Sequence, residues 1–171
     1  MNAVLEPEAL FANIEHKEAG KRILFVCTGN TCRSPMAAAL YNARFSGDGS
    51  RAFSAGLAAD GSGISRNAVL ALERAGIIPA PDNDYPAHVS HTVTEADLEK
   101  ADLVIGITGR HAMQLMFAAP EYASRITSMS VDIADPYGGD EQVYAECLQQ
   151  IEEALREMFV SADEGACHGE D

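Results

Sequence analysis

One segment near the start of the chain leaves little freedom for its fold, because an apolar run leads through a polar loop into an alanine-rich stretch. Residues 23–26 are all apolar, which predicts a buried strand that ends at Cys27. Seven residues later, Ser34-Pro35 begins a helical pattern that extends over residues 34–46. The segment therefore predicts a strand that turns through a short loop directly into a helix.

The loop between this strand and this helix has the composition of an anion site. Backbone N–H groups of such a loop converge on an anion, and the helix N-terminus adds positive potential. Arg33 can bind two phosphate oxygens at once, and a thiol at the position of Cys27 should ionise more easily than a free cysteine. A buried cysteine beside a surface arginine would produce the same spacing. The flanking strand and helix favour a phosphate site with a nucleophile at its floor.

Predicted strands and helices alternate along the chain. We expect strands at residues 22–27, 51–55, 102–108 and 126–131. We expect helices at residues 34–46, 65–76, 94–100, 110–118 and about 140–160. The last helix should pack on the sheet through Val143, Cys147, Leu148, Ile151, Leu155 and Met158. The alternation predicts an α/β fold, in which helices cover both faces of a parallel sheet and ligands bind at the carboxyl ends of its strands.

Both ends of the chain lie outside this pattern. Residues 1–21 form an acidic arm ahead of the first strand, and residues 161–171 lack apolar periodicity, which predicts a mobile tail. The remaining residues, 22–160, have the length of one domain. No apolar run approaches the ~20 residues that span a bilayer, no secretion signal is recognisable, and the four cysteines are unevenly spread. We therefore expect a cytoplasmic protein without a membrane partner.

The chain is strongly acidic, with a formal net charge of −14 from 26 acidic and 12 basic residues. This charge argues against nucleic acid as a partner and favours basic peptides, although it would also serve simply as a solubilising exterior. A phosphate site in such a protein needs local positive charge. Arg33 and backbone amides can supply it at distances where remote carboxylates are screened.

A second motif follows the last predicted strand, in residues 132–140. Because the carboxyl ends of parallel strands share one edge of a sheet, this motif should lie near Cys27. A phosphatase that uses a cysteine needs a proton donor for the leaving atom, and Asp135, ahead of Pro136, is the best-placed carboxylic acid. The same residues would also simply form a turn and cap the final helix. The residues alone leave both interpretations open.

The two motifs together resemble the low-molecular-weight protein tyrosine phosphatase family, and most closely its bacterial branch of protein arginine phosphatases. The resemblance rests on residues 27–36 (CTGNTCRSPM) and on residues 135–139 (DPYGG). Shorter matching pieces lie at residues 54–56, 88–90 and 101–104. The resemblance covers about residues 22–160 and implies a phosphatase domain built as a three-layer α/β sandwich, with a four-stranded parallel sheet in the order 2-1-3-4.

The resemblance implies a role for each residue of the two motifs. Cys27 attacks phosphorus and forms a cysteinyl-phosphate, while Arg33 and the loop amides hold the phosphate oxygens. Asp135 protonates the leaving atom and then deprotonates the water that hydrolyses the intermediate. The phosphate-binding residues would be Thr28, Gly29, Asn30, Thr31, Cys32, Arg33 and Ser34, and the supporting network would be Asn30, Ser34, Ser54 and His88. This chemistry calls for no metal and no cofactor.

The resemblance also bears on the substrate, which would be a phosphorylated protein. Tyrosine phosphatases of this family usually carry isoleucine at the position of Thr31, whereas arginine phosphatases carry threonine. Gly138-Gly139 is also similar to the arginine branch, but Tyr137 stands where those enzymes often have phenylalanine. Phosphoarginine is therefore the expected substrate, and phosphotyrosine is the alternative.

The cysteines bear on the remaining alternatives. In this family, residues at the positions of Cys27 and Cys32 can form a disulfide under oxidation, although Cys32 would equally suit a buried structural thiol. The related arsenate reductases need two further cysteines in mid-chain, and none lies between Cys32 and Cys147, which we expect in the core. A phosphoprotein-binding module without turnover is another alternative. The presence of Cys27, Arg33 and Asp135 together argues against it.

Overall fold

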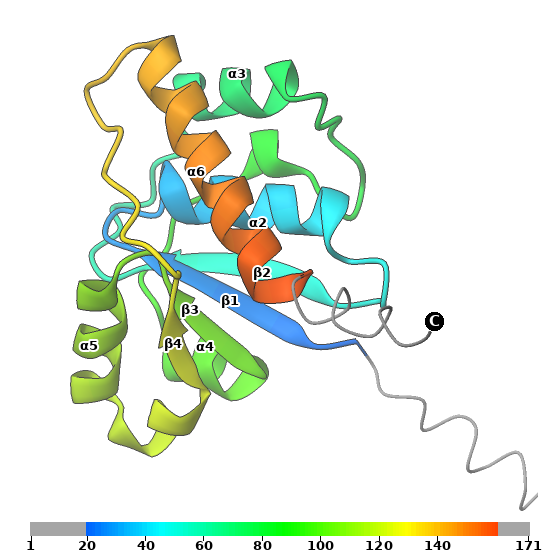
Figure 1. Ribbon diagram of the computed structural model, residues 1–171. Helices are drawn as coiled ribbons and strands as arrows, with labels where there is room; N and C mark the ends of the chain where they lie inside the picture. The colour runs from blue at the N-terminus through cyan, green and yellow to red at the C-terminus, as the bar shows by residue number, and fades with distance from the viewer. Residues whose placement is uncertain (1–19, 161–171) are drawn as a thin grey trace, which may run out of the picture.

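Four short strands form one parallel sheet, whose order is β2-β1-β3-β4 (Figure 1). The strands are β1 (Arg22–Cys27), β2 (Arg51–Gly56), β3 (Leu103–Gly106) and β4 (Ile126–Ser128). This is the expected order 2-1-3-4. The computed structural model describes residues 20–160, so the predicted tail and residues 1–19 of the predicted arm lie outside the described residues.

The central strand β1 shows why the sheet is buried on both sides. It pairs with β2 along one edge and with β3 along the other. Alternate side chains point to opposite faces, so that Ile23 and Phe25 join one apolar cluster while Leu24 and Val26 join a second. A strand that is covered on both faces requires the continuous apolar run found in the sequence.

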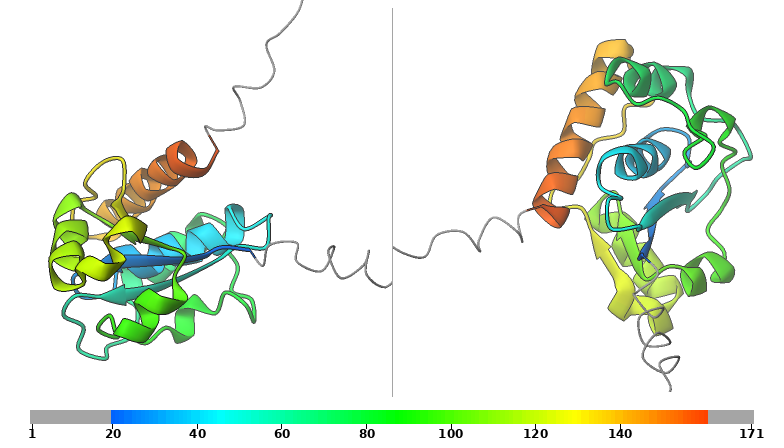
Figure 2. Two further views of the ribbon diagram at one scale, coloured as in Figure 1. Left: turned by 90° about the horizontal axis from the view of Figure 1, so that it is seen from below. Right: turned by 90° about the vertical axis from the view of Figure 1, so that its right-hand side faces the viewer.

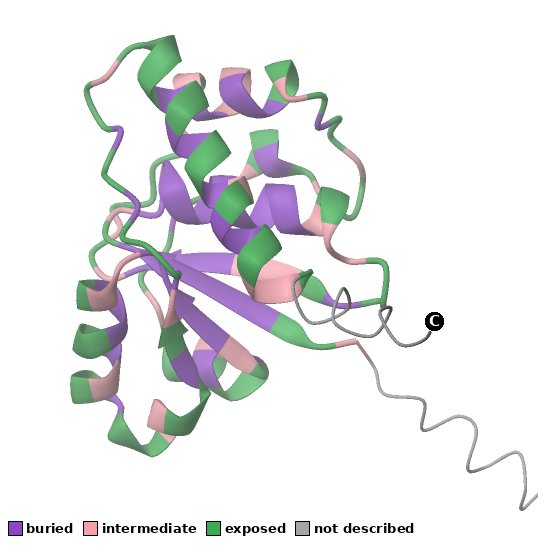
Figure 3. Ribbon diagram, viewed as in Figure 1, coloured by how far each residue is buried: buried purple, intermediate pink, exposed green. Residues whose placement is uncertain are grey.

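Helices cover both faces of the sheet and complete an α/β sandwich of three layers (Figure 2). One face packs against α2 (Arg33–Arg44), α3 (Arg66–Arg74) and α6 (Glu141–Phe159). The other face packs against α4 (Glu95–Lys100) and α5 (Gly109–Ala118). Two short 3-10 helices, η1 (Tyr85–Ala87) and η2 (Pro120–Arg125), lie in the connections. Buried residues gather along the sheet and the inner sides of the helices (Figure 3).

The buried face of α6 differs from the expected one at its N-terminal end. Cys147 and the apolar residues that follow it pack into the core as predicted. Val143, however, is 40% exposed, and Tyr144 is buried instead. Val143 precedes Cys147 by four residues and Tyr144 precedes Leu148 by four, so helical spacing is compatible with either residue. The loop that leads into α6 decides between them, because it places Val143 against Gly139.

The strands β3 and β4 are shorter than residues 102–108 and 126–131, the ranges that the sequence predicts. β3 ends at Gly106 because α5 crosses close to it: a Cβ atom on this glycine would lie 2.6 Å from the backbone nitrogen of Ala112. Thr108 already caps α5 by accepting a hydrogen bond from the His111 N–H at 3.3 Å. None of the helices in residues 20–160 has the length and apolar character that crossing a bilayer demands.

Candidate active site

The loop that joins β1 to α2 is shaped by one asparagine. Asn30 has φ 57°, the left-handed conformation that asparagine adopts more readily than most residues. Its buried side chain donates from Nδ2 to Ser34 Oγ at 2.8 Å and to Ser54 Oγ at 3.0 Å. Its carbonyl oxygen is 2.8 Å from His88 Nε2. The structure thus brings together the four residues of the predicted supporting network.

The Cys27 sulfur lies at the floor of this loop, and the residue is only 2% exposed. Its Sγ atom is 3.0 Å from Ser34 Oγ, and the backbone N–H of Asn30 donates to it over 3.3 Å. The Ser34 hydroxyl hydrogen can be donated to the carbonyl oxygen of Ala55 at 3.4 Å or to the sulfur. A negatively charged sulfur at 3.0 Å would favour the second bond and would then have two donors. Ser34 is fully buried, so it contacts the sulfur from inside the protein and is not exposed in the pocket above the loop.

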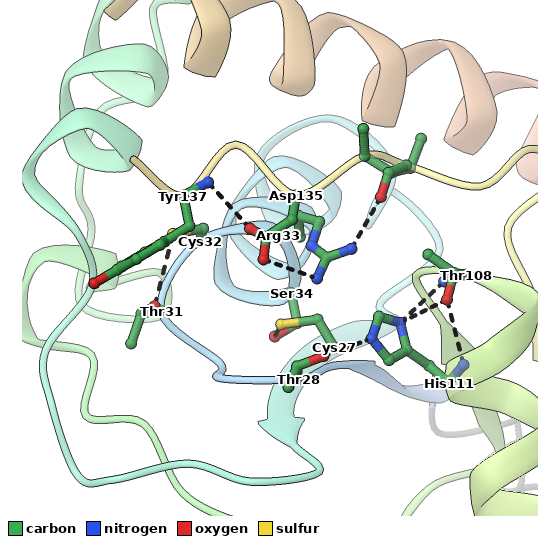
Figure 4. A network of polar contacts seen from close by, with 12 residues as sticks. Cys27, Thr28, Thr31, Cys32, Arg33, Ser34, Thr108, His111, Asp135 and Tyr137 are labelled. Atoms are coloured by element: carbon green, nitrogen blue, oxygen red, sulfur yellow. Dashed lines mark hydrogen bonds and ion pairs between the residues drawn. The ribbon is translucent and has the colours of Figure 1, made fainter. Parts of the chain in front are cut away.

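Arg33, the first residue of α2, connects the loop to the segment that follows β4 (Figure 4). Its Nη1 donates to the carbonyl oxygen of Ile133 at 3.0 Å, and its Nη2 lies 3.6 Å from Asp135 Oδ2. The other carboxylate oxygen of Asp135 accepts from the Tyr137 N–H at 3.1 Å. The two sequence motifs, which we expect at one edge of the sheet, are therefore in direct contact.

Residues 135–140 do form a turn and a helix cap. The N–H of Gly139 donates to the carbonyl of Pro136 at 2.8 Å, and Gly138 has φ 81°, as the third residue of a type II turn requires. Asp140 caps α6 by accepting from a backbone N–H at 3.0 Å. The cap is Asp140 rather than Asp135, so the turn is compatible with Asp135 facing the loop.

A pocket opens above residues 27–33, which we call the 27–33 loop. The loop forms its floor, and its mouth is lined by Ala58, Asp60, Asp135 and Tyr137. Tyr137 is 79% exposed at this mouth. Arg33 is the one cationic side chain among the described residues that line the pocket. The pocket thus combines an arginine and backbone amides at its floor with two carboxyl groups and an aromatic ring at its mouth.

Comparison with known proteins assigns this arrangement to a family. Residues 22–166 match the family described as low molecular weight phosphotyrosine protein phosphatase. The chain belongs to this family. It is a low molecular weight phosphatase with the sheet order and the paired motifs that the sequence resemblance implies.

Individual relatives of this phosphatase carry different activities in their names. The protein-arginine-phosphatase of Bacillus subtilis (strain 168) is 36% identical over 146 residues, which are 80% of this chain and 93% of the relative. An arsenate reductase of Halalkalibacterium halodurans is 34% identical over 145 residues, 85% of this chain and 97% of the relative. The solved structure of the YwlE arginine phosphatase from Geobacillus stearothermophilus matches this chain with a TM-score of 0.72 and 34% identity. The match covers 88% of this chain and 99% of the YwlE chain.

The sequence patterns do not single out His111, which lies behind the 27–33 loop, or Asp60, which lines the phosphatase pocket. His111 is 4% exposed, and its Nε2 lies 3.0 Å from Thr28 Oγ1. The spacing of Thr108 and His111 is that of a capping box, which would have predicted the N-terminus of α5 but not the contact with the loop. Asp60 lies in a turn, where its Oδ1 accepts from the Ser62 N–H at 2.9 Å, and nothing local indicates that it lines the pocket.

Cys32 is a buried residue of the 27–33 loop, and its Sγ is 3.2 Å from the hydroxyl oxygen of Tyr144. Burial, followed by the contact with Cys32, raises the pKa of Tyr144 to about 12. Cys27, Cys32 and Cys147 are free thiols in the described part of the chain, so the disulfide between Cys27 and Cys32 stays a prediction. Cys147 is a core residue as expected. No cluster of three or more potential metal ligands lies within residues 20–160.

Proposed function

We propose that this phosphatase hydrolyses phosphoarginine in proteins through a covalent phosphate on Cys27. The observation that carries the proposal is the division of charge within one pocket. Two donors meet the Cys27 sulfur at the floor, Arg33 lines the same floor, and the carboxyl groups of Asp60 and Asp135 lie at the mouth. An anionic phosphoryl group and a cationic guanidinium match these two regions in that order.

In the first step the Cys27 thiolate attacks phosphorus, so that an S–P bond forms and the P–N bond to the arginine side chain breaks. Arg33 and the backbone N–H groups of the 27–33 loop stabilise the charge on the phosphoryl oxygens. Asp135 gives its proton to the departing nitrogen. The arginine side chain therefore leaves as a guanidinium instead of a neutral guanidine, which is a much stronger base.

In the second step water attacks the phosphorus of the cysteinyl-phosphate. The Asp135 carboxylate takes a proton from this water, and the S–P bond breaks to release inorganic phosphate. The thiolate returns to the hydrogen bonds of Ser34 and the Asn30 N–H. Asp135 ends the cycle protonated and ready for the next substrate. The proposed cycle uses no metal or cofactor.

The mouth of the pocket supports phosphoarginine as the substrate. Hydrogen bonds from Ser62 lower the pKa of Asp60, which keeps this carboxylate charged at neutral pH. A guanidinium is a planar cation that carboxylates attract and that stacks on aromatic faces, and the Tyr137 ring is available for stacking. Thr31 adds a hydroxyl group to the wall. The relatives named as arginine phosphatases support the same assignment.

Phosphotyrosine is the second candidate substrate, because the exposed ring of Tyr137 would also stack on a phenol. The family description itself names phosphotyrosine. Arsenate reduction is less compatible with the chain, because the chain has no cysteine between Cys32 and Cys147 that could relay a disulfide. A silent binding module is less compatible as well, because Cys27, Arg33 and Asp135 all line one pocket.

Assays of one peptide sequence that carries either phosphoarginine or phosphotyrosine test the proposal. We expect a kcat/KM for phosphoarginine at least about tenfold higher, the discrimination that a few pocket contacts provide. Cys27→Ser should release no phosphate from either peptide. A preference for phosphotyrosine would overturn the arginine assignment, and sustained turnover by Cys27→Ser would overturn the covalent mechanism.

Thr31→Ile tests the role of the pocket wall in this preference. Isoleucine replaces a hydroxyl group by a larger apolar side chain, which disfavours a guanidinium and accommodates a phenol ring. We expect the ratio of the two kcat/KM values to shift toward phosphotyrosine by about tenfold or more. Thr31→Ser keeps the hydroxyl group and is the matched control, with a ratio close to that of the unmodified protein. An unchanged ratio in Thr31→Ile would remove Thr31 from the substrate argument.

A further inference from the structure

His111 connects α5 to the 27–33 loop, and its two ring nitrogens have different partners (Figure 4). The backbone N–H of Thr108 donates to Nδ1 at 3.1 Å, and Nε2 lies 3.0 Å from Thr28 Oγ1. Nδ1 is also 3.1 Å from Thr108 Oγ1, which already accepts from the His111 N–H and can donate its own hydrogen to Nδ1. A backbone amide nitrogen can only donate, so Nδ1 is the acceptor in this pair. The proton of the neutral ring is therefore on Nε2, and it is donated to the hydroxyl oxygen of Thr28.

The surroundings of His111 keep its ring neutral. Burial, followed by the positive charge of Arg33, lowers the pKa of His111 to about 4, although Asp132 and Asp135 act in the opposite direction. A second proton would sit on Nδ1 and would break the hydrogen bond that this nitrogen accepts from the Thr108 N–H, leaving only Thr108 Oγ1 as its partner. The ring therefore keeps one tautomer near neutral pH.

This tautomer determines what the Thr28 hydroxyl group can do. The Thr28 hydroxyl oxygen accepts a hydrogen bond from His111 Nε2–H. The hydrogen of the Thr28 hydroxyl group is therefore available for another acceptor. Within the described part of the chain, His111 is the one side chain that is bonded to this hydroxyl group. Thr28 lines the pocket next to Cys27. A phosphoryl group bound at the floor of the same pocket would therefore be an acceptor for this hydrogen.

We propose that His111 is a positioning residue that turns the Thr28 hydroxyl group into a hydrogen-bond donor for the bound phosphoryl group. The Thr28 hydroxyl group then acts on the phosphoryl group together with the loop amides and Arg33. His111 on α5 orients this hydroxyl group. The inference rests on the proposed use of the 27–33 loop as the phosphate site, but it is independent of whether arginine or tyrosine carries the phosphate.

Four substitutions separate this role from a structural one. Thr28→Val removes the hydroxyl group and Thr28→Ser keeps it. His111→Asn keeps an acceptor near the position of Nδ1 for the Thr108 N–H but lacks the donor to Thr28, whereas His111→Gln places an amide N–H near the position of Nε2. The exposed His91 bonds to Asp97 on α4 through its ring, and His91→Asn is the matched control.

The readouts are kcat/KM for para-nitrophenyl phosphate and the inhibition constant of inorganic phosphate. We expect Thr28→Val and His111→Asn each to lower kcat/KM by about 10- to 100-fold, the range for one hydrogen bond to a charged group, and to weaken phosphate binding. Thr28→Ser and His111→Gln should recover most of the activity, and His91→Asn should match the unmodified protein. The double variant Thr28→Val/His111→Asn should be no worse than either single variant, because both remove the same donor.

Strictly additive losses in the double variant, or unchanged kcat/KM and phosphate inhibition in Thr28→Val, would overturn the inference. Thr28 is exposed at the surface, so its two variants decide the matter even if His111→Asn does not fold. Nitrogen NMR of the ring gives a separate readout, and a protonated Nδ1 at neutral pH would also contradict it. If the unmodified protein neither turns over para-nitrophenyl phosphate nor binds phosphate, the proposed function fails together with this inference. If the unmodified protein is active and Thr28→Val has the same kcat/KM and phosphate inhibition, only this inference fails.

Discussion

Asp135 has two neighbours that decide where its carboxyl group can act. Arg33 lies 3.6 Å from one oxygen, and the Tyr137 N–H donates to the other over 3.1 Å. Its side chain is 56% exposed and would otherwise sample many orientations in solvent. The two contacts instead hold it at the pocket that it lines, which is where the proposed general acid has to be.

Replacing Asp135 by asparagine removes the proton and keeps the shape. Asp135→Asn retains an oxygen for the Tyr137 N–H but has no acidic proton for the leaving nitrogen. We expect kcat for a phosphoarginine peptide to fall by about 10²- to 10⁴-fold, with the inhibition constant of phosphate changed much less. Asp140→Asn is the matched control, because asparagine caps a helix as well as aspartate does. Near-normal turnover by Asp135→Asn would show that the acid is another group.

Among the elements of the fold, the end of β2 and the two residues after it hold the 27–33 loop in place through their backbone. The N–H of Leu57 donates to the Cys27 carbonyl and the N–H of Ala58 to the Thr28 carbonyl, both at 2.9 Å. This approach is possible because Gly56 ends β2: a Cβ atom there would lie 2.6 Å from the carbonyl oxygen of Thr28. The geometry of the loop therefore depends on a strand that lies outside the motif.

Adding one methyl group at the end of β2 should disturb this support. Gly56→Ala forces the strand and the loop apart, and we expect a loss of about 1–3 kcal/mol in the free energy of unfolding together with at least tenfold lower turnover of para-nitrophenyl phosphate, about 1.4 kcal/mol in barrier height. Gly47→Ala is the control, since a Cβ atom there meets nothing within 4 Å. Urea denaturation and initial rates measure both quantities. Equal behaviour of the two variants would contradict the proposed support.

Over the whole chain the net charge is −14, whereas the one cationic side chain among the described residues that line the pocket is Arg33 at its floor. In the proposed mechanism the floor acts over a few ångströms, because Arg33 and the loop amides would contact the phosphoryl group directly. The remaining charge acts over a Debye length, which is about 10 Å at 0.1 M salt. Selection of a phosphoryl group and attraction of the surrounding peptide are thus separated by distance.

The salt dependence of turnover should follow this separation. For a phosphoarginine peptide flanked by lysines, kcat/KM should fall several-fold as salt rises from about 20 to 200 mM, since screening weakens its attraction to the acidic surface. The same peptide flanked by glutamates should show the opposite trend. Stopped assays at a series of salt concentrations measure both slopes. If the two peptides respond alike, the global charge has no part in substrate capture.

The sequence by itself determined the elements that depend on local pattern. The apolar run at residues 23–26 and the alternation of strands and helices specify the sheet, since a period of two or of 3.6 residues is encoded by neighbours in the chain. The two motifs likewise place Cys27, Arg33 and Asp135 at one edge, because parallel strands end on the same side of the sheet.

Only the tertiary structure decided which distant side chains line the pocket or contact the 27–33 loop. His111 and Thr28 are 83 positions apart in the chain, and Tyr144 and Cys32 are 112 apart, so no local pattern encodes either contact. Asp60 lines the pocket from a surface turn, and the sequence of that turn does not indicate where on the surface it lies. Tyr144, not Val143, faces the core because the rotation of α6 about its axis is set by the loop before it and by packing, which the helical period alone does not specify.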